Sequence, residues 1–123
     1  SNSNHNTIPY NNTRQDLSND LDTTTGEFSP TTKGAHIVSA NVIDFNGNDS
    51  DNRDLRLQNI TDSVTVGRYP QFATQSAKSI GFADMMFLDP TKTYAVQYRN
   101  RSTASVDLSS SNEDTRLGVV SIA

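Results

Sequence analysis

The chain has 123 residues, of which 33% are hydrophobic, a formal net charge of −4 and no cysteine. This length predicts a single domain, and the missing cysteines exclude disulfides, zinc–thiolate sites and cysteine nucleophiles within this sequence. The negative charge and the scattered Lys and Arg argue against a nucleic-acid partner, and no apolar run reaches the ~18 residues of a membrane span, so we expect no membrane insertion.

Polar residues that favour turns dominate the composition. Even with Gly included, the apolar share stays below the ~45–50% of ordinary globular domains, and Ser, Thr, Asn and Asp supply more than two fifths of the chain. Their side chains compete for backbone hydrogen bonds and disfavour helix interiors. The composition therefore predicts a loop-rich β protein with a small core, which association with further copies would stabilise.

Residues 1–9 contain little that could be buried, and we expect a flexible linker or the remnant of a stalk. From residue 10 onward, short alternations of apolar and polar residues between Gly, Pro and Asn/Asp turns predict about eight strands. They fall at residues 27–28, 35–45, 55–60, 63–72, 79–88, 93–100, 105–108 and 116–123. Because no window keeps helical spacing, residues 10–123 are predicted to form an antiparallel sandwich or barrel.

The strand at "GFADMMFLDP", residues 81–90, carries apolar side chains on both faces. Side chains alternate along a strand, so Phe82, Met86 and Leu88 should share one face and Met85 and Phe87 the other. One face can fill the core of a sandwich. The other face then needs a separate cover.

Three segments, taken in their order along the chain, resemble a known family. They are "LDTTTGEFSPTTKGAHIVSANVIDFNG", a short strand ending in an aromatic, a Pro/Gly turn and a long strand ending in Phe-x-Gly; "MMFLDPTKTYAVQY", an apolar strand, a charged turn and an alternating strand; and the terminal strand "RLGVVSIA". Together they resemble the tumour necrosis factor superfamily and its relatives, the globular heads of complement and of collagen-like proteins. The turn Asp89–Lys92 departs from the Gly-Asp pair usual in the family.

The resemblance implies an all-β, antiparallel jelly-roll sandwich of about eight to ten strands that assembles as a homotrimer. The second face of residues 81–90 would then pack against neighbouring copies near a threefold axis. The residues expected at this trimer interface are Phe82, Met85, Met86, Phe87, Tyr98 and His36. The alternative is that loops of the same chain cover this face, as loops often cover one face of a sheet.

Neither a catalytic nor a metal site is predicted. His36 has no Gly-x-Ser-x-Gly turn to partner it, and the loop that begins at Asp44 has Asp49 and Leu55 where a calcium loop needs Gly and Glu. No cofactor is therefore expected.

Aromatic and polar residues outside the core are the candidates for receptor contact, because binding residues concentrate on loops of a rigid scaffold. The candidates are Tyr69, Phe72, Asn48 and Asp51. The alternative for the aromatics is that they cap the ends of the sandwich.

These observations predict a non-enzymatic binding head. We expect the C-terminal receptor-binding knob of a phage spike or fibre, located on the virion surface, with a host cell-surface protein or glycan and other virion or stalk proteins as partners. The alternatives are the head of a collagen-like bacterial or spore-surface protein, in an extracellular or cell-surface location, and a purely structural capsid or base component.

Overall fold

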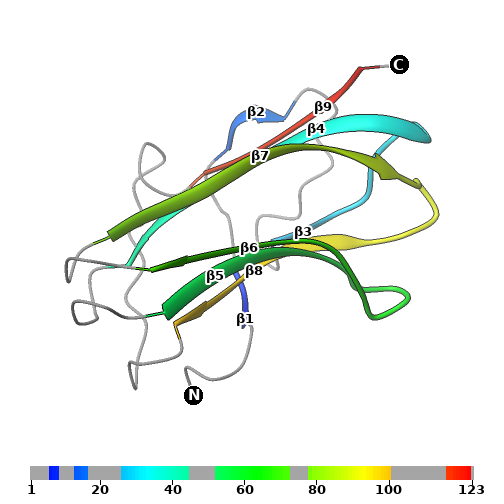
Figure 1. The fold of residues 1–123 in the computed structure, drawn as a ribbon. Coiled ribbons are helices and arrows are strands. Elements are labelled where there is room, and N and C mark those ends of the chain that lie inside the picture. The colour runs from blue at the N-terminus through cyan, green and yellow to red at the C-terminus, as the bar shows by residue number, and fades with distance from the viewer. Residues whose placement is uncertain are drawn as a thin grey trace.

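The computed structural model describes residues 6–8, 13–16, 26–44, 52–72, 78–100 and 116–122. Within these ranges the strands form two sheets that lie face to face (Figure 1). The prediction of an all-β sandwich is therefore confirmed. No helix in the described part of the chain is long and apolar enough to cross a membrane.

The larger sheet has five strands, of which four follow the order β1-β8-β5-β6 while the short β3 also pairs with β8. All of its pairs are antiparallel, and β6 lies at an edge. The register of β5 and β6 shifts between Leu57 and Gln58, a local irregularity of the kind that a β-bulge produces. The bounds are β1 Asn6–Thr7, β3 Glu27–Phe28, β5 Asn52–Asn59, β6 Val64–Phe72 and β8 Tyr94–Asn100.

The smaller sheet has four strands in the order β2-β9-β4-β7. Strand β4 is paired along its whole length with β7 and on its other side with β9, both antiparallel. The pair of β2 and β9 is parallel, whereas the pairs of β4 with β7 and β9 are antiparallel as predicted. The bounds are β2 Thr13–Asp16, β4 Gly34–Asp44, β7 Lys78–Leu88 and β9 Arg116–Ser121.

The core lies between the two sheets and is built from the alternate residues of each strand. In β4 the even-numbered positions Val38, Ala40 and Val42 are buried, and in β5 Leu55 and Leu57 face them from the opposite sheet. The alternation read from the sequence thus corresponds to the inward face of β4 and β5, whereas Val64 and Val66 of β6 are exposed. The other buried hydrophobic residues are Ile8, Phe28, Ile80, Met86, Leu88, Tyr94, Ala95, Val96, Tyr98 and Leu117.

Residues 6–8, which we predicted to belong to a linker, are part of the sandwich. Asn6 and Thr7 pair with β8, the backbone N–H of Ile8 donates to the carbonyl oxygen of Val96 at 3.0 Å, and Ile8 is only 2% exposed. The prediction failed here because one isoleucine among polar neighbours carries no alternation. Strand β2, Thr13–Asp16, was not predicted because it contains no apolar residue at all. The predicted strand at 105–108 lies outside the described residues.

Replacing Leu57 with Ala should lower the free energy of unfolding by about 3 kcal/mol, because the side chain is fully buried and its loss leaves a cavity. Urea denaturation at fixed protein concentration measures this change. Val64→Ala is the matched control: Val64 is 53% exposed, and its truncation should change stability by less than about 0.5 kcal/mol. Equal effects of the two substitutions would contradict the assigned core.

Candidate functional site

Four exposed hydrophobic side chains gather on the outer face of the smaller sheet. The register of β4 and β7 places Ile37 opposite Met85 and Ala35 opposite Phe87. On the other side of β4, the backbone N–H of Ile122 donates to the carbonyl oxygen of Ala35 at 3.1 Å. The exposed fractions are 44% for Ile37, 60% for Met85, 78% for Phe87 and 46% for Ile122. We call these four residues the outer apolar face.

The two faces of β7 differ as the sequence predicted. Met86 is 6% exposed and Leu88 is 2% exposed, so both fill the core, while Met85 and Phe87 point away from it. Phe82 is half-buried and packs against the core. Of the six residues expected at a trimer interface, therefore, Met85 and Phe87 lie on an exposed surface.

The interface prediction is corrected for Met86, Tyr98 and His36, which the protomer itself covers. Tyr98 is 2% exposed and belongs to the core cluster. His36 is 3% exposed, and its Nδ1 lies 2.9 Å from the carbonyl oxygen of Gly34. All three occupy strand positions on the inward side. His36 pairs with Met86 across β4 and β7, and Tyr98 pairs with the buried Leu55 across β8 and β5.

The edge of the sandwich is closed by residues from β6 and β7, one strand from each sheet. The rings of Tyr69 and Phe82 stack with centroids 4.1 Å apart and planes at 8°. The Tyr69 hydroxyl donates to Oδ2 of Asp84 at 2.8 Å. Gly67 leaves room for this arrangement, since a Cβ at that position would lie 3.2 Å from Cε of Met86 and closer still to the Tyr69 hydroxyl.

Tyr69 thus lies within the strand predicted at residues 63–72 and links the two sheets, and it does not stand on a loop of the scaffold. Burial first, and then the hydrogen bond to Asp84 and the charge of its carboxylate, raise the pKa of the Tyr69 phenol well above its usual range. The phenol therefore stays protonated as a donor at neutral pH. Phe72 is the last residue of β6, and Asn48 and Asp51 lie outside the described residues, so a receptor role for these four residues stays a prediction.

A cluster of charged side chains lies on the outer face of the larger sheet. Asp54 is 1% exposed and accepts hydrogen bonds at its Oδ2 from Nη2 of Arg99 at 2.7 Å and from Nη2 of Arg68 at 3.0 Å. Nε of Arg56 donates to Oε1 of Gln97 at 2.7 Å. We call Arg56, Arg68 and Arg99 the arginine cluster.

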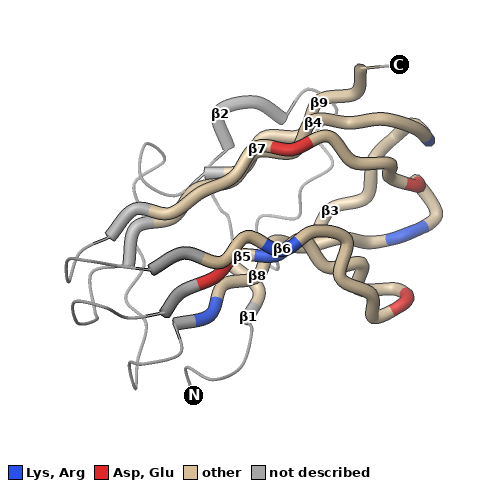
Figure 2. The backbone as a smooth tube through the Cα atoms, viewed as in Figure 1, with Lys and Arg blue, Asp and Glu red and all other residues tan. Residues whose placement is uncertain are grey.

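The sequence did not reveal this cluster, because its members are far apart along the chain. The pairing of β5 with β6 places Arg56 opposite Arg68. The pairing of β5 with β8 places Arg56 opposite Gln97 and Asp54 opposite Arg99. Figure 2 shows basic positions on β6 and β8 on either side of an acidic position on β5. The alternation of Leu55 and Leu57 with Arg56 indicated that Arg56 points outward, but the neighbours across the sheet depend on register.

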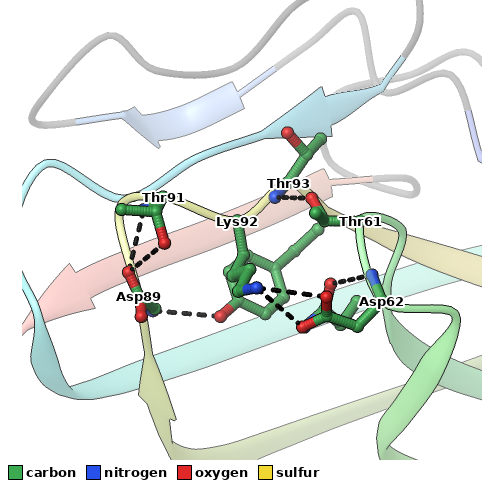
Figure 3. A network of polar contacts seen from close by, with 8 residues as sticks. Thr61, Asp62, Asp89, Thr91, Lys92 and Thr93 are labelled. Carbon is green, nitrogen blue, oxygen red and sulfur yellow. Dashed lines mark hydrogen bonds and ion pairs between the residues drawn. The ribbon is translucent and has the colours of Figure 1, made fainter.

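Two turns at one end of the sandwich are held together by polar contacts (Figure 3). In the β7–β8 turn, Oδ1 of Asp89 accepts from the backbone N–H of Thr91 at 2.9 Å and from its hydroxyl at 2.8 Å. Nζ of Lys92 lies 3.1 Å from both carboxylate oxygens of Asp62 in the β5–β6 turn. The hydroxyl of Thr61 accepts from the backbone N–H of Thr93 at 2.9 Å. The turn predicted at Asp89–Lys92 therefore also fixes the neighbouring turn.

Among the described residues, no group of three or more His, Cys, Asp or Glu side chains is placed to hold a metal ion. Asp44 ends β4 and the last positions of the calcium-like loop, residues 52–55, belong to β5, while residues 45–51 lie outside the described residues. His36 has no acidic neighbour among its hydrogen bonds in this part of the chain; its recorded contact is a carbonyl oxygen.

Comparison with solved structures identifies the fold. The structure of murine APRIL at pH 8.5 superposes with a TM-score of 0.66 and 16% identity, over 89% of this chain and 80% of that chain. The globular domain of zebrafish complement 1qA protein superposes with a TM-score of 0.60 and 15% identity, over 98% of this chain and 84% of that chain. APRIL belongs to the tumour necrosis factor family, so the chain has the jelly roll of that family and of complement globular heads, as the sequence resemblance implied.

Neither the scan against protein-family models nor the search of curated proteins finds a match for this sequence. At identities of 15–16% the structural likeness establishes the fold. Function must therefore be argued from the surfaces of this chain.

Replacing Tyr69 with Phe should lower the free energy of unfolding by about 1 kcal/mol, because the hydrogen bond to Asp84 is lost while the stacked ring remains. The same substitution in an Asp84→Ala background should have a smaller effect, since the partner is already absent. Chemical denaturation of the four proteins in this cycle measures the coupling. Additive effects would mean that the bond does not tie the two sheets together.

Proposed function

We propose that three copies of this chain assemble through the outer apolar face into a non-enzymatic binding head. We propose further that this head is the C-terminal receptor-binding knob of a bacteriophage spike or fibre. It would lie on the virion surface, attach to a host cell-surface protein or glycan, and connect to other virion or stalk proteins.

The outer apolar face is the observation that carries the proposal. Phe87, Met85 and Ile37 are large hydrophobic side chains that lie on adjacent strands and are 44–78% exposed in one copy. Removing apolar surface from water contributes about 25 cal/mol per Å². A contiguous exposed apolar surface of this kind commonly marks a protein–protein interface.

A closed ring of copies explains the face better than an open array. Cyclic symmetry uses up the apolar surface of every subunit, whereas an unclosed contact leaves a sticky end and grows into filaments. Three is the number that the family resemblance implies, and the fold agrees with it. In the alternative, segments of the same chain cover the face and the protein is a monomer.

Composition supports the choice of a phage knob. The chain lacks cysteine and is rich in Asn, Ser, Thr and Asp, which suits an exposed microbial or viral surface domain. The second candidate is the head of a collagen-like bacterial or spore-surface protein, in which the trimer aligns a stalk. The likeness to a complement globular domain over 98% of this chain supports that candidate.

Replacing Phe87 with Asp should dissociate the trimer into folded monomers, because an unpaired charge in the interface costs several kcal/mol. Met86→Asp should instead unfold the chain, because Met86 is 6% exposed and lies in the core. Sedimentation velocity with circular dichroism distinguishes the two outcomes.

Val64→Asp is the matched control for this pair. Val64 is 53% exposed but lies on β6 in the other sheet, so the variant should keep the mass of the wild type. A Phe87→Asp variant with the mass of the wild type would contradict the proposed interface.

Fluorescently labelled protein should bind host cells and compete with the virus for attachment, since a knob carries the recognition surface. The folded Phe87→Asp monomer should bind at least tenfold more weakly to cells, because three linked sites raise the effective concentration of the second contact. A trimer that neither binds cells nor blocks infection would contradict receptor recognition and favour the stalk-aligning head.

A further inference from the structure

The arginine cluster carries more positive charge than its recorded partners balance. Its three guanidinium groups lie on three adjacent strands, and within the described ranges their ion pairs are made with one carboxylate, that of Asp54. This local excess of positive charge occurs in a chain whose net charge is −4. It therefore requires an explanation specific to this part of the sheet.

Among the residues that the structure describes, several donors of the cluster make no hydrogen bond. Arg68 and Arg99 both use Nη2 on the same oxygen of Asp54, and Arg56 uses Nε on Gln97. A guanidinium has five N–H donors, so each arginine keeps others. Nε of Arg99 is buried and has no hydrogen-bond partner within the described part of the chain.

The cluster is also held in place and reachable from solvent. Asp54 is 1% exposed and fixes two guanidinium groups at 2.7 and 3.0 Å, so little side-chain freedom is left to lose on binding. The side chain of Arg68 is 49% exposed, whereas that of Arg99 is 13% exposed. A ligand could thus approach over Arg68 and meet donors that are already oriented.

The electrostatics of Arg56 agree with this geometry. Burial chiefly lowers the pKa of Arg56, the Asp54 carboxylate opposes that effect, and the like charges of Arg68 and Arg99 lower it further. Arg68 and Arg99 therefore lie close enough to Arg56 to repel it, while the Asp54 carboxylate attracts it. An additional anion between them would relieve the repulsion.

We propose that the arginine cluster is a binding site for an oxyanion, namely a carboxylate, sulfate or phosphate group. The forked guanidinium donors match the oxygen geometry of these groups. The site lies on the outer face of the larger sheet, and the outer apolar face lies on the other sheet, so occupation of one surface does not block the other. The inference is independent of the proposed trimer and of the phage assignment.

An NMR titration tests the site. Uniformly ¹⁵N-labelled protein is titrated separately with inorganic phosphate, inorganic sulfate and polygalacturonate, at constant ionic strength set with chloride. The Nε–H signals of the arginine cluster should shift and saturate with at least one of these probes. Saturation by an inorganic ion indicates a free anion as the ligand, and saturation by polygalacturonate alone indicates an acidic polysaccharide.

Two variants and one control keep the test decisive. Arg56→Gln and Arg68→Gln should each weaken binding by about tenfold or more, because a charge-assisted hydrogen bond is lost. Lys33→Gln removes the same charge from an exposed position between β3 and β4, and its affinity should stay within about twofold of the wild type. Folding of each variant is checked by its amide spectrum, and Arg68→Gln serves if Arg56→Gln does not fold.

Unsaturable or absent shifts with all three probes would overturn the proposal. Equal weakening in Lys33→Gln and in the cluster variants would also overturn it, because binding would then reflect overall charge. In either case the pairs of Asp54 with Arg68 and Arg99 would have a structural role only.

Discussion

The alternation of side chains along β7 is the constraint on which the other features depend. This strand lies at the edge of its sheet, with Met86 and Leu88 in the core and Met85 and Phe87 in solvent. A strand with one polar face would need no partner. Because β7 is apolar on both faces, the sandwich buries one of them and leaves the other exposed, and we propose that further copies of the chain cover it.

The two sheets present different outer surfaces, and this difference suggests a division of tasks. The outer face of the smaller sheet is apolar around Phe87 and suits permanent burial between subunits. The outer face of the larger sheet carries Asp54 and the arginine cluster and suits contact with a soluble or polymeric anion. At one end, the contact of Lys92 with Asp62 holds adjacent turns of this same chain together.

Much of the fold could be predicted from the sequence, because long strands such as β4 and β8 alternate clearly between apolar and polar residues. Ile8 and β2 could not, since short strands are defined by backbone pairing and leave little trace in side-chain pattern. His36 was assigned to the wrong surface, although it lies two residues before the buried Val38 and the alternation along β4 therefore places it on the inward face. The arginine cluster was missed for a different reason: Arg68 and Arg99 meet Asp54 only through pairings across the sheet.

The central claim is that the exposed side of β7 is covered by further copies of the chain. Light scattering coupled to size-exclusion chromatography measures the mass of the unaltered protein across micromolar concentrations and tests this claim directly. The account predicts a single species with three times the mass of one chain. A cooperatively folded species with the mass of one chain would contradict it.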